Sequence, residues 1–211
     1  MNNLLFHDIQ EYLDRLNKIS KTEDEVLLKE MEDLASRLNF PIVNRSVGRF
    51  LYLITKLKKP KLVVEIGSGF GYSAYWFAKA LDEGKVILTD YKEENIKMAK
   101  NFLEKANLLE KAEFRVGNGV EVAKEYKEVD IFFFDHEKSK YLETVLQIKD
   151  NLKSGGLLIA DNTLWHGKVL EESPDNQTKK IKEFNEYMFS SPEFFCSLVP
   201  IRDGVLVAIK L

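Results

Sequence analysis

Acidic and amide side chains follow two apolar runs in the second half of the chain. Asp135 comes directly after the run VDIFFF, and Asp161 with Asn162 comes after LLIA. Such runs predict strands buried on both faces of a parallel sheet, and the carboxyl ends of these strands meet at one edge. Two carboxylates and an amide oxygen at that edge would suit Mg²⁺. The alternative is that both aspartates only cap helices.

Lys138 follows Asp135 by three residues, in the sequence Asp-His-Glu-Lys. One helical turn would return its ammonium group to the side of Asp135. A divalent cation nearby favours the neutral amine, which can then act as a general base. An ordinary surface lysine is the alternative.

A glycine-rich turn within residues 62–81, LVVEIGSGFGYSAYWFAKAL, predicts a cofactor cradle between a buried strand and a helix. Glycine lets the backbone approach a ligand because it has no Cβ, and three glycines occur here: Gly67, Gly69 and Gly71. The dinucleotide pattern would need glycine where Tyr72 stands, and Glu65 would repel a pyrophosphate. The segment therefore favours a ligand with an amino or sulfonium cation over NAD, and a plain structural turn is the alternative.

Asp90 ends the next predicted strand, at residues 86–89. A carboxylate at this position can accept hydrogen bonds from both hydroxyls of a ribose. Capping the helix predicted over residues 92–106 is the alternative, and one residue can do both.

Asn118 follows a further strand, at residues 112–116, and is also expected at the edge of the sheet. The long polar connection at residues 166–178 predicts a mobile loop near the site.

Strands and helices alternate through the chain after residue 61. We expect strands at 63–66, 86–89, 112–116, 129–134 and 156–160, and helices at 93–106, 120–126, 141–152 and 181–189. This alternation predicts βαβ units and a parallel sheet. Two β-rich runs around Arg202-Asp203-Gly204 predict a final hairpin, which adds an antiparallel strand.

Three helices are expected before the first strand. The first covers residues 4–18, the second begins at a capping box of Thr22 and Glu25, and the third covers 46–58. We expect one domain over residues 1–211, in which residues 1–58 form a helical cap that supplies a dimer contact or a wall of the substrate site.

The composition is that of a globular protein, with 45% hydrophobic and 31% charged residues among 211. No apolar run approaches the roughly 20 residues that span a bilayer, and the N-terminus lacks the pattern of a signal peptide. A single cysteine, Cys196, allows no internal disulfide and predicts a cytoplasmic location. The net charge of −3 provides no global attraction to nucleic acid.

The segments FFFDHEKSKY (132–141), SGGLLIADNTLWHGKV (154–169) and VPIRDGVLVAIKL (199–211) carry a family resemblance. With them, the chain from residue 41 resembles the cation-dependent S-adenosylmethionine O-methyltransferases, the group of catechol and caffeoyl-CoA O-methyltransferases and their bacterial branch. The resemblance implies an α/β fold, a Rossmann-like class I methyltransferase sheet, mostly parallel with a C-terminal antiparallel hairpin strand and helices on both faces. It also implies S-adenosylmethionine, a divalent cation (Mg²⁺, with Mn²⁺ or Ca²⁺ as alternatives) and a homodimer.

The resemblance assigns roles position by position. The implied metal ligands are Asp135, Asp161 and Asn162, and the implied catalytic residues are Lys138 and Asp135. The implied cofactor-binding residues are Val43, Glu65, Gly67, Ser68, Gly69, Gly71, Ser73, Asp90, Asn118, Gly119 and Asp135. His166 replaces an asparagine that touches the substrate in the plant caffeoyl-CoA enzymes. From its place in the loop after Asn162, Trp165 could form an aromatic wall for a planar acceptor, and a half-buried packing residue is the alternative. Pro200 stands where the animal catechol enzyme has a catechol-binding glutamate.

Together these observations predict methyl transfer to a small molecule with vicinal oxygens, such as a catechol. A tRNA base of the 5-hydroxyuridine type also offers vicinal oxygens and is the main alternative acceptor. The sequence also leaves open an NAD oxidoreductase and a non-catalytic binding module, and no membrane partner is expected.

Overall fold

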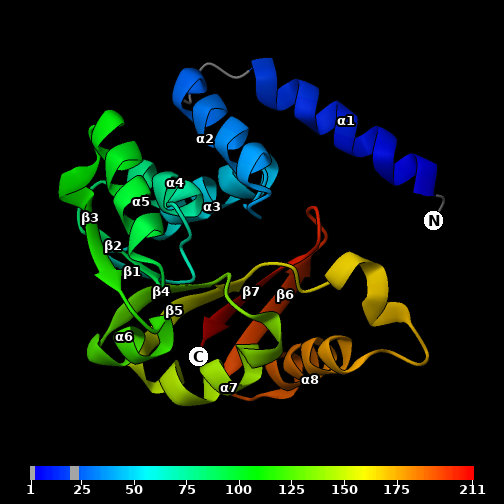
Figure 1. The fold of residues 1–211 in the computed structure, drawn as a ribbon. Helices are drawn as coiled ribbons and strands as arrows, with labels where there is room; N and C mark the ends of the chain where they lie inside the picture. Colours follow the sequence, from blue (N-terminus) through cyan, green and yellow to red (C-terminus); the bar gives the residue numbers. More distant parts are fainter. Residues whose placement is uncertain (1–2, 20–23) are drawn as a thin grey trace.

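A seven-stranded sheet forms the centre of the molecule in the computed structural model, which describes residues 3–19 and 24–211 (Figure 1). Its strands are β1 (Leu62–Ile66), β2 (Lys85–Asp90), β3 (Ala112–Val116), β4 (Val129–Phe134), β5 (Leu152–Ala160), β6 (Phe194–Val199) and β7 (Val205–Lys210). They lie in the order β3-β2-β1-β4-β5-β7-β6. Strands β1 to β5 pair in parallel, and β7 runs antiparallel to both β5 and β6. The expected mostly parallel sheet with a C-terminal antiparallel hairpin is confirmed.

Helices precede the first strand and cover both faces of this sheet. They are α1 (Asn3–Ile19), α2 (Glu25–Leu38), α3 (Arg45–Lys58), α4 (Tyr72–Ala80), α5 (Glu93–Lys105), α6 (Gly119–Glu125), α7 (Tyr141–Ile148) and α8 (Asn176–Ser190). Helices α3 to α5 lie on one face and α6 to α8 on the other (Figure 1). Successive side chains of a strand point to opposite faces of the sheet. Phe133 therefore packs in the core between the sheet and α4, whereas Phe132 and Phe134 pack in the core between the sheet and helices α7 and α8. This double burial explains why the strand sequences are continuously apolar.

Side chains cap the N-termini of α3, α6 and α8. Asn44 Oδ1 accepts a hydrogen bond from Val47 N at 3.0 Å at the start of α3, and Asp175 Oδ1 accepts one from Thr178 N at 2.7 Å at the start of α8. The capping box expected at Thr22 lies outside the described residues.

Two predicted boundaries are wrong. The helix expected over residues 141–152 ends at Ile148, and Leu152 already pairs with Val129 of the neighbouring strand. Pairing with β4 therefore extends β5 four residues before the predicted strand. The connection expected at 166–178 is also shorter than predicted, because a 3₁₀ segment spans Trp165–Leu170 and α8 begins at Asn176.

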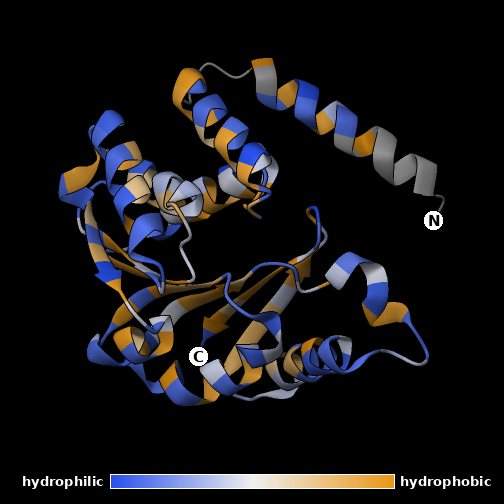
Figure 2. Cartoon of the chain, viewed as in Figure 1, coloured by the Kyte–Doolittle hydropathy of each residue, from blue (hydrophilic) through white to orange (hydrophobic). Residues whose placement is uncertain are grey.

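Helix α1 stands apart from the sheet in Figure 1. Its described contacts include a hydrogen bond from Asn17 Nδ2 to Ser46 Oγ at 3.0 Å. Apolar side chains along it stay exposed, from 41% for Leu16 to 70% for Ile19, and they alternate with hydrophilic residues in Figure 2. None of the described helices is both long and apolar enough to cross a membrane.

Candidate active site

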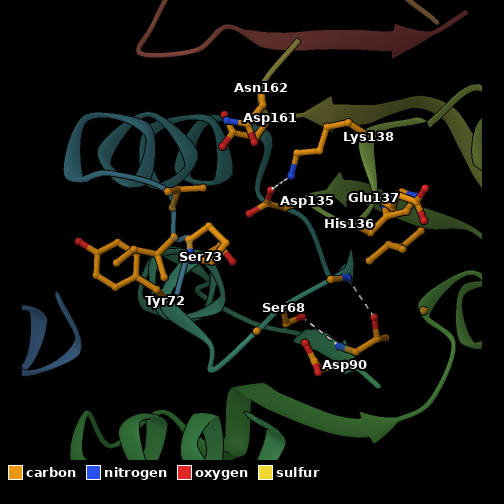
Figure 3. Close-up of a pocket in the computed structure, with 18 of the residues that line it drawn as sticks. Ser68, Tyr72, Ser73, Asp90, Asp135, His136, Glu137, Lys138, Asp161 and Asn162 are labelled. Atoms are coloured by element: carbon orange, nitrogen blue, oxygen red, sulfur yellow. Dashed lines mark hydrogen bonds and ion pairs between the residues drawn. The ribbon is translucent and has the colours of Figure 1, made fainter. Parts of the chain in front are cut away.

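A cavity of about 640 Å³ opens at the carboxyl ends of the parallel strands. The segments that follow β1, β2, β3, β4 and β5 all contribute to its wall, and the segment 40–43 before α3 closes it from the cap side. Figure 3 shows part of its lining, with Asp135, Lys138, Asp161 and Asn162 labelled. Fourteen of the residues singled out in the sequence line the cavity: Val43, Gly67, Ser68, Gly69, Ser73, Asp90, Asn118, Gly119, Asp135, Lys138, Asp161, Asn162, Trp165 and His166. Glu65 and Gly71 are not among its lining residues.

Asp135, Asp161 and Asn162 meet at the ends of β4 and β5, as their positions after the strands predict. Burial raises the pKa of Asp161 to about 7, and the charge of Asp135 adds to that rise. Burial also raises the pKa of Asp135, against the opposing charge of Lys138. Asp161 Oδ1 is buried without a hydrogen-bond partner among the described residues. Asp161 therefore lacks full compensation for its lost hydration, whereas the charge of Asp135 is offset in part by Lys138.

This donor set fits a divalent cation that retains several waters. A cation between the two carboxylates would offset both the burial and the mutual repulsion. The described residues contain no group of three or more His, Cys, Asp or Glu side chains arranged for a metal. The third protein ligand would accordingly be the amide oxygen of Asn162, with a substrate or water in the remaining positions.

Tyr141 fixes the two strand ends relative to each other. Its buried hydroxyl contacts both Phe134 O at 2.9 Å and Asp161 O at 3.1 Å. Burial raises the pKa of this hydroxyl well above its ordinary value, so it stays protonated.

Lys138 Nζ lies 2.6 Å from Asp135 Oδ1 (Figure 3). A short 3₁₀ segment, Lys138–Lys140, replaces the helical turn expected there and still returns the ammonium group to this carboxylate. His136 instead contacts Thr144 Oγ1 through Nε2 at 2.9 Å and packs on Tyr141. Burial lowers the pKa of His136 to about 3, so the ring is neutral.

Glu65 is the buried carboxylate at the end of β1. Burial raises its pKa to about 8. The nearby hydroxyls of Ser68 and Ser73 partly oppose this rise, yet neither carboxylate oxygen has a hydrogen-bond partner of good geometry among the described residues. An ammonium group would supply the missing partner, as expected for the amino end of a cofactor.

The glycines of the turn are required by packing against the protein itself. Gly67 and Gly71 have φ angles of +90° and +89°. A Cβ on Gly67 would lie 2.8 Å from Asp135 O, and one on Gly71 would lie 2.9 Å from Ala99 Cβ. The structural turn that the sequence left open as the alternative thus accounts for part of the need for glycine here, because a Cβ at either position would meet neighbouring protein atoms.

Asp90 and Asn118 have local structural roles as well. Asp90 Oδ1 accepts hydrogen bonds from Lys92 N at 2.8 Å and Asn95 Nδ2 at 3.0 Å. The helix after it begins at Glu93 with Lys92 at the N-cap position, so Asp90 is not the N-cap residue. Asn118 caps α6 by accepting from Val120 N at 2.9 Å. Both residues still line the cavity and keep a face toward it.

Trp165 and His166 line the side of the cavity expected to bind the acceptor, and the turn between β6 and β7 fixes their backbone. Buried Asp203 accepts a hydrogen bond from His166 N, and its own carbonyl accepts one from Leu164 N at 2.8 Å. These bonds hold Trp165 and His166 at φ angles of +49° and +55°. Strained backbone of this kind persists where the surroundings determine it.

Sequence reasoning missed Arg202 as a residue of this wall. The expected site residues lie mostly at the ends of parallel strands, whereas Arg202 lies in the antiparallel hairpin. The only signal in the sequence was an arginine in the centre of an Asp-Gly turn.

The chain matches the sequence model of the O-methyltransferase family over residues 17–211. It is 31% identical over 202 residues to caffeoyl-CoA O-methyltransferase 2 of Petunia hybrida, covering 87% of this chain and 83% of that protein. A methyltransferase structure from Geobacter sulfurreducens superimposes with a TM-score of 0.84 at 30% identity, covering 97% and 96% of the two chains. An O-methyltransferase from Bacillus cereus in complex with SAH has the same fold, with a TM-score of 0.84 at 23% identity over 94% and 96%.

The fold and these matches define a Rossmann-like methyltransferase. The chain belongs to the O-methyltransferase family that contains the caffeoyl-CoA enzymes, and it is an S-adenosylmethionine-dependent O-methyltransferase. This membership removes the NAD oxidoreductase alternative.

Proposed function

We propose that this enzyme methylates one of two vicinal oxygens on a small catechol-like molecule and that it requires a divalent cation. The single observation that carries the proposal is the pair of buried, partly uncompensated carboxylates of Asp135 and Asp161 beside Lys138. Such a pair is costly unless a cation and its ligands complete it.

The side chains at the acceptor end of the cavity would have three separate roles: binding the cation, accepting the proton and orienting the acceptor. Asp135, Asp161 and Asn162 would hold the cation, preferably Mg²⁺, with Mn²⁺ or Ca²⁺ as alternatives. When bound, the cation supplies Lewis acidity that lowers the pKa of a hydroxyl. The same cation would favour the neutral amine of Lys138, and Nζ, which lies 2.6 Å from Asp135, would then be placed to receive the proton from that hydroxyl. The wall formed by Trp165 would orient a planar acceptor.

The opposite end of the cavity would bind S-adenosylmethionine. Glu65 would receive its ammonium group, and Asp90 its ribose hydroxyls. Ser68, Ser73 and the turn at Gly67, Gly69 and Gly71 would surround the methionine portion, with Val43 and the Asn118-Gly119 pair at the adenosine. Catalysis would then consist mainly of holding the acceptor oxygen in line with the sulfonium methyl group.

Methyl transfer from S-adenosylmethionine to catechol and to tRNA, each with Mg²⁺ or EDTA, tests the proposal. We expect transfer to the catechol that EDTA and Asp161→Asn both abolish. Transfer to tRNA alone would move the acceptor to a 5-hydroxyuridine-type base. Metal-independent transfer would contradict the cation site, and undiminished transfer by Lys138→Met would contradict the role of Lys138 as the base.

We further propose that the chain is one domain in which the helices within residues 1–58 form a cap, and that two copies pair through it. The exposed apolar side chains Ile9, Tyr12, Leu16 and Ile19 of α1 support this pairing. Sedimentation of the chain and of Leu16→Glu tests it, since a homodimer held by α1 should dissociate in the variant. The lone Cys196 supports a cytoplasmic location.

A further inference from the structure

Arg202 is a cationic side chain at the acceptor end of the cavity that has no role in the function proposed above. It lies in the turn between β6 and β7 and lines the cavity with Trp165 and His166. Burial raises the pKa values of Asp135 and Asp161, and the positive charge of Arg202 opposes that rise at both. The guanidinium is therefore within electrostatic reach of the reacting groups.

The hydrogen-bonding capacity of Arg202 is mostly unused in the described part of the chain. Nη1 donates to Ile42 O at 2.7 Å, which ties the turn to the segment before α3. A guanidinium has five N–H donors in a planar fork, so this one bond leaves an edge of the fork available.

Arg202 also lacks an ion pair with any described carboxylate, unlike its cationic neighbours. Lys138, which lines the same cavity, is paired with Asp135. Arg45, in the adjoining cavity under the cap, contacts Glu25 at 2.5 Å and Glu32 at 2.6 Å. Arg202 also lines this adjoining cavity, whose acidic residues include Glu32 and Asp33, and its side chain is exposed. Its charge is therefore accessible to a group that enters from outside.

The turn fixes the backbone at Arg202. Arg202 has a φ angle of +50°, an unusual conformation for a residue with a Cβ. Gly204 N donates to Ile201 O at 2.9 Å within the turn, and Thr163 N donates to Gly204 O at 3.0 Å across it. Strain maintained by such bonds is typical of functional positions.

We propose that Arg202 binds an anionic group on the methyl acceptor, a carboxylate or a phosphate-type oxyanion of a small molecule, and so selects acidic acceptors. This inference rests on the proposed function, because it concerns the acceptor of that reaction. The planar fork matches two oxygens of a carboxylate or phosphate at once. The acceptor would lie with its vicinal oxygens at Asp135 and Asp161 and its anionic end at Arg202, beside Ile42 of the cap.

Three acceptors with the same two hydroxyls test this inference: 3,4-dihydroxybenzoate, 3,4-dihydroxyphenylphosphonate and neutral 3,4-dihydroxybenzamide. We expect kcat/KM of the full chain with Mg²⁺ to be at least about tenfold higher for one of the anions than for the amide, as one charged hydrogen bond would give. Arg202→Gln should remove this preference by raising KM for the preferred anion, and it should change kcat/KM for the amide by less than about twofold. Arg202→Lys should retain part of the preference for the anion.

Calorimetric titration of the same acceptors into the chain with Mg²⁺ and S-adenosylhomocysteine gives a readout without turnover. Arg202→Gln should weaken binding of the preferred anion about tenfold. Arg37→Gln, at an exposed position of α2, is the matched control and should change neither measurement. The preferred anion distinguishes a carboxylate from a phosphate-type group.

Equal kcat/KM for anions and amide, or a preference that persists in Arg202→Gln, would overturn the inference and leave the proposed function standing. An equal loss for all three acceptors would show that Arg202 only ties the turn to Ile42. If no diol is methylated, the proposed function fails. In that case the calorimetric titration alone tests the role of Arg202. If binding of the anions does not depend on Arg202, the inference is overturned together with the proposed function.

Discussion

Lys138 Nζ and Asp135 Oδ1 lie 2.6 Å apart, with both side chains less than one-fifth exposed. The same carboxylate also faces Asp161, so the candidate base and the candidate cation ligands form one electrostatic unit. If an acceptor hydroxyl binds beside Asp135 and Asp161, its proton would have a short path to Lys138 Nζ. The arrangement joins two strand ends and one 3₁₀ segment at a single point of the cavity.

Replacing Lys138 with methionine should lower kcat about 10²- to 10⁴-fold, because a general base of this kind contributes that much. Binding of S-adenosylhomocysteine, measured by calorimetry, should change little, since Lys138 lies on the acceptor side. Lys140→Met is the control, because Lys140 is exposed and pairs with Glu143. A kcat within about threefold of the parent enzyme would rule out proton transfer to Lys138 as an important step.

Glu65 should make the cofactor-free protein less stable as the pH rises. Its pKa is about 8 in the fold and about 4.3 in an unfolded chain. Between these values the folded state binds more protons than the unfolded state, so the free energy of unfolding falls with increasing pH. The stabilisation is complete below the unfolded pKa and is lost as the pH approaches about 8.

Urea unfolding at pH 6 and pH 9 measures this effect in the parent chain and in Glu65→Gln. The variant should lose much of the pH dependence, because glutamine cannot ionise. An identical fall in both proteins would assign the pH dependence to other groups, such as Asp161, whose pKa is also raised.

Tyr72→Phe should weaken the attachment of the cap to the sheet. The buried hydroxyl of Tyr72, at the start of α4, donates to Glu32 Oε1 of α2 at 2.6 Å. Loss of this part-buried hydrogen bond should cost about 1.5 kcal/mol of unfolding free energy, the lower end for a charged partner, because Glu32 is one-third exposed and keeps its bond to Arg45. Denaturant unfolding measures the loss, and Tyr12→Phe on the exposed face of α1 should cost almost nothing. Equal effects of the two substitutions would show that the contact with Glu32 contributes no stability.

Two alanine substitutions separate backbone strain from packing at the glycine turn. Gly71 and Gly155 have φ angles of +89° and +73°, so alanine at either should cost about 1 kcal/mol. Only Gly71 has a neighbour in the way, Ala99 Cβ at 2.9 Å from the added atom, which should add about 1–3 kcal/mol. Thermal unfolding should therefore show the larger loss for Gly71→Ala. A larger loss for Gly155→Ala would contradict this packing effect.

The sheet and most of its site were predictable because their signals are local. A continuous apolar run such as IFFF indicates a doubly buried strand, and Asp135 directly after it indicates a residue at the sheet edge. The end of α7 was not predictable, because nothing in the helical pattern before Leu152 shows that β4 will pair with it. Arg202 was missed for the same reason, since its place beside the cavity depends on contacts with Ile42 and the loop after β5.

The central claim is that Asp135, Asp161 and Asn162 hold a divalent cation. Titration of Mn²⁺ into the chain with S-adenosylhomocysteine, followed by the paramagnetic resonance signal of free Mn²⁺, tests it directly. We expect one tight Mn²⁺ per chain, competed by Mg²⁺, and an affinity at least about 100-fold lower in Asp161→Asn, since even outer-shell changes cost 10- to 100-fold. Asp150→Asn, at an exposed acid, should bind as the parent chain does. Equal Mn²⁺ binding by the parent chain and Asp161→Asn, or no tight binding by either, would contradict the claim.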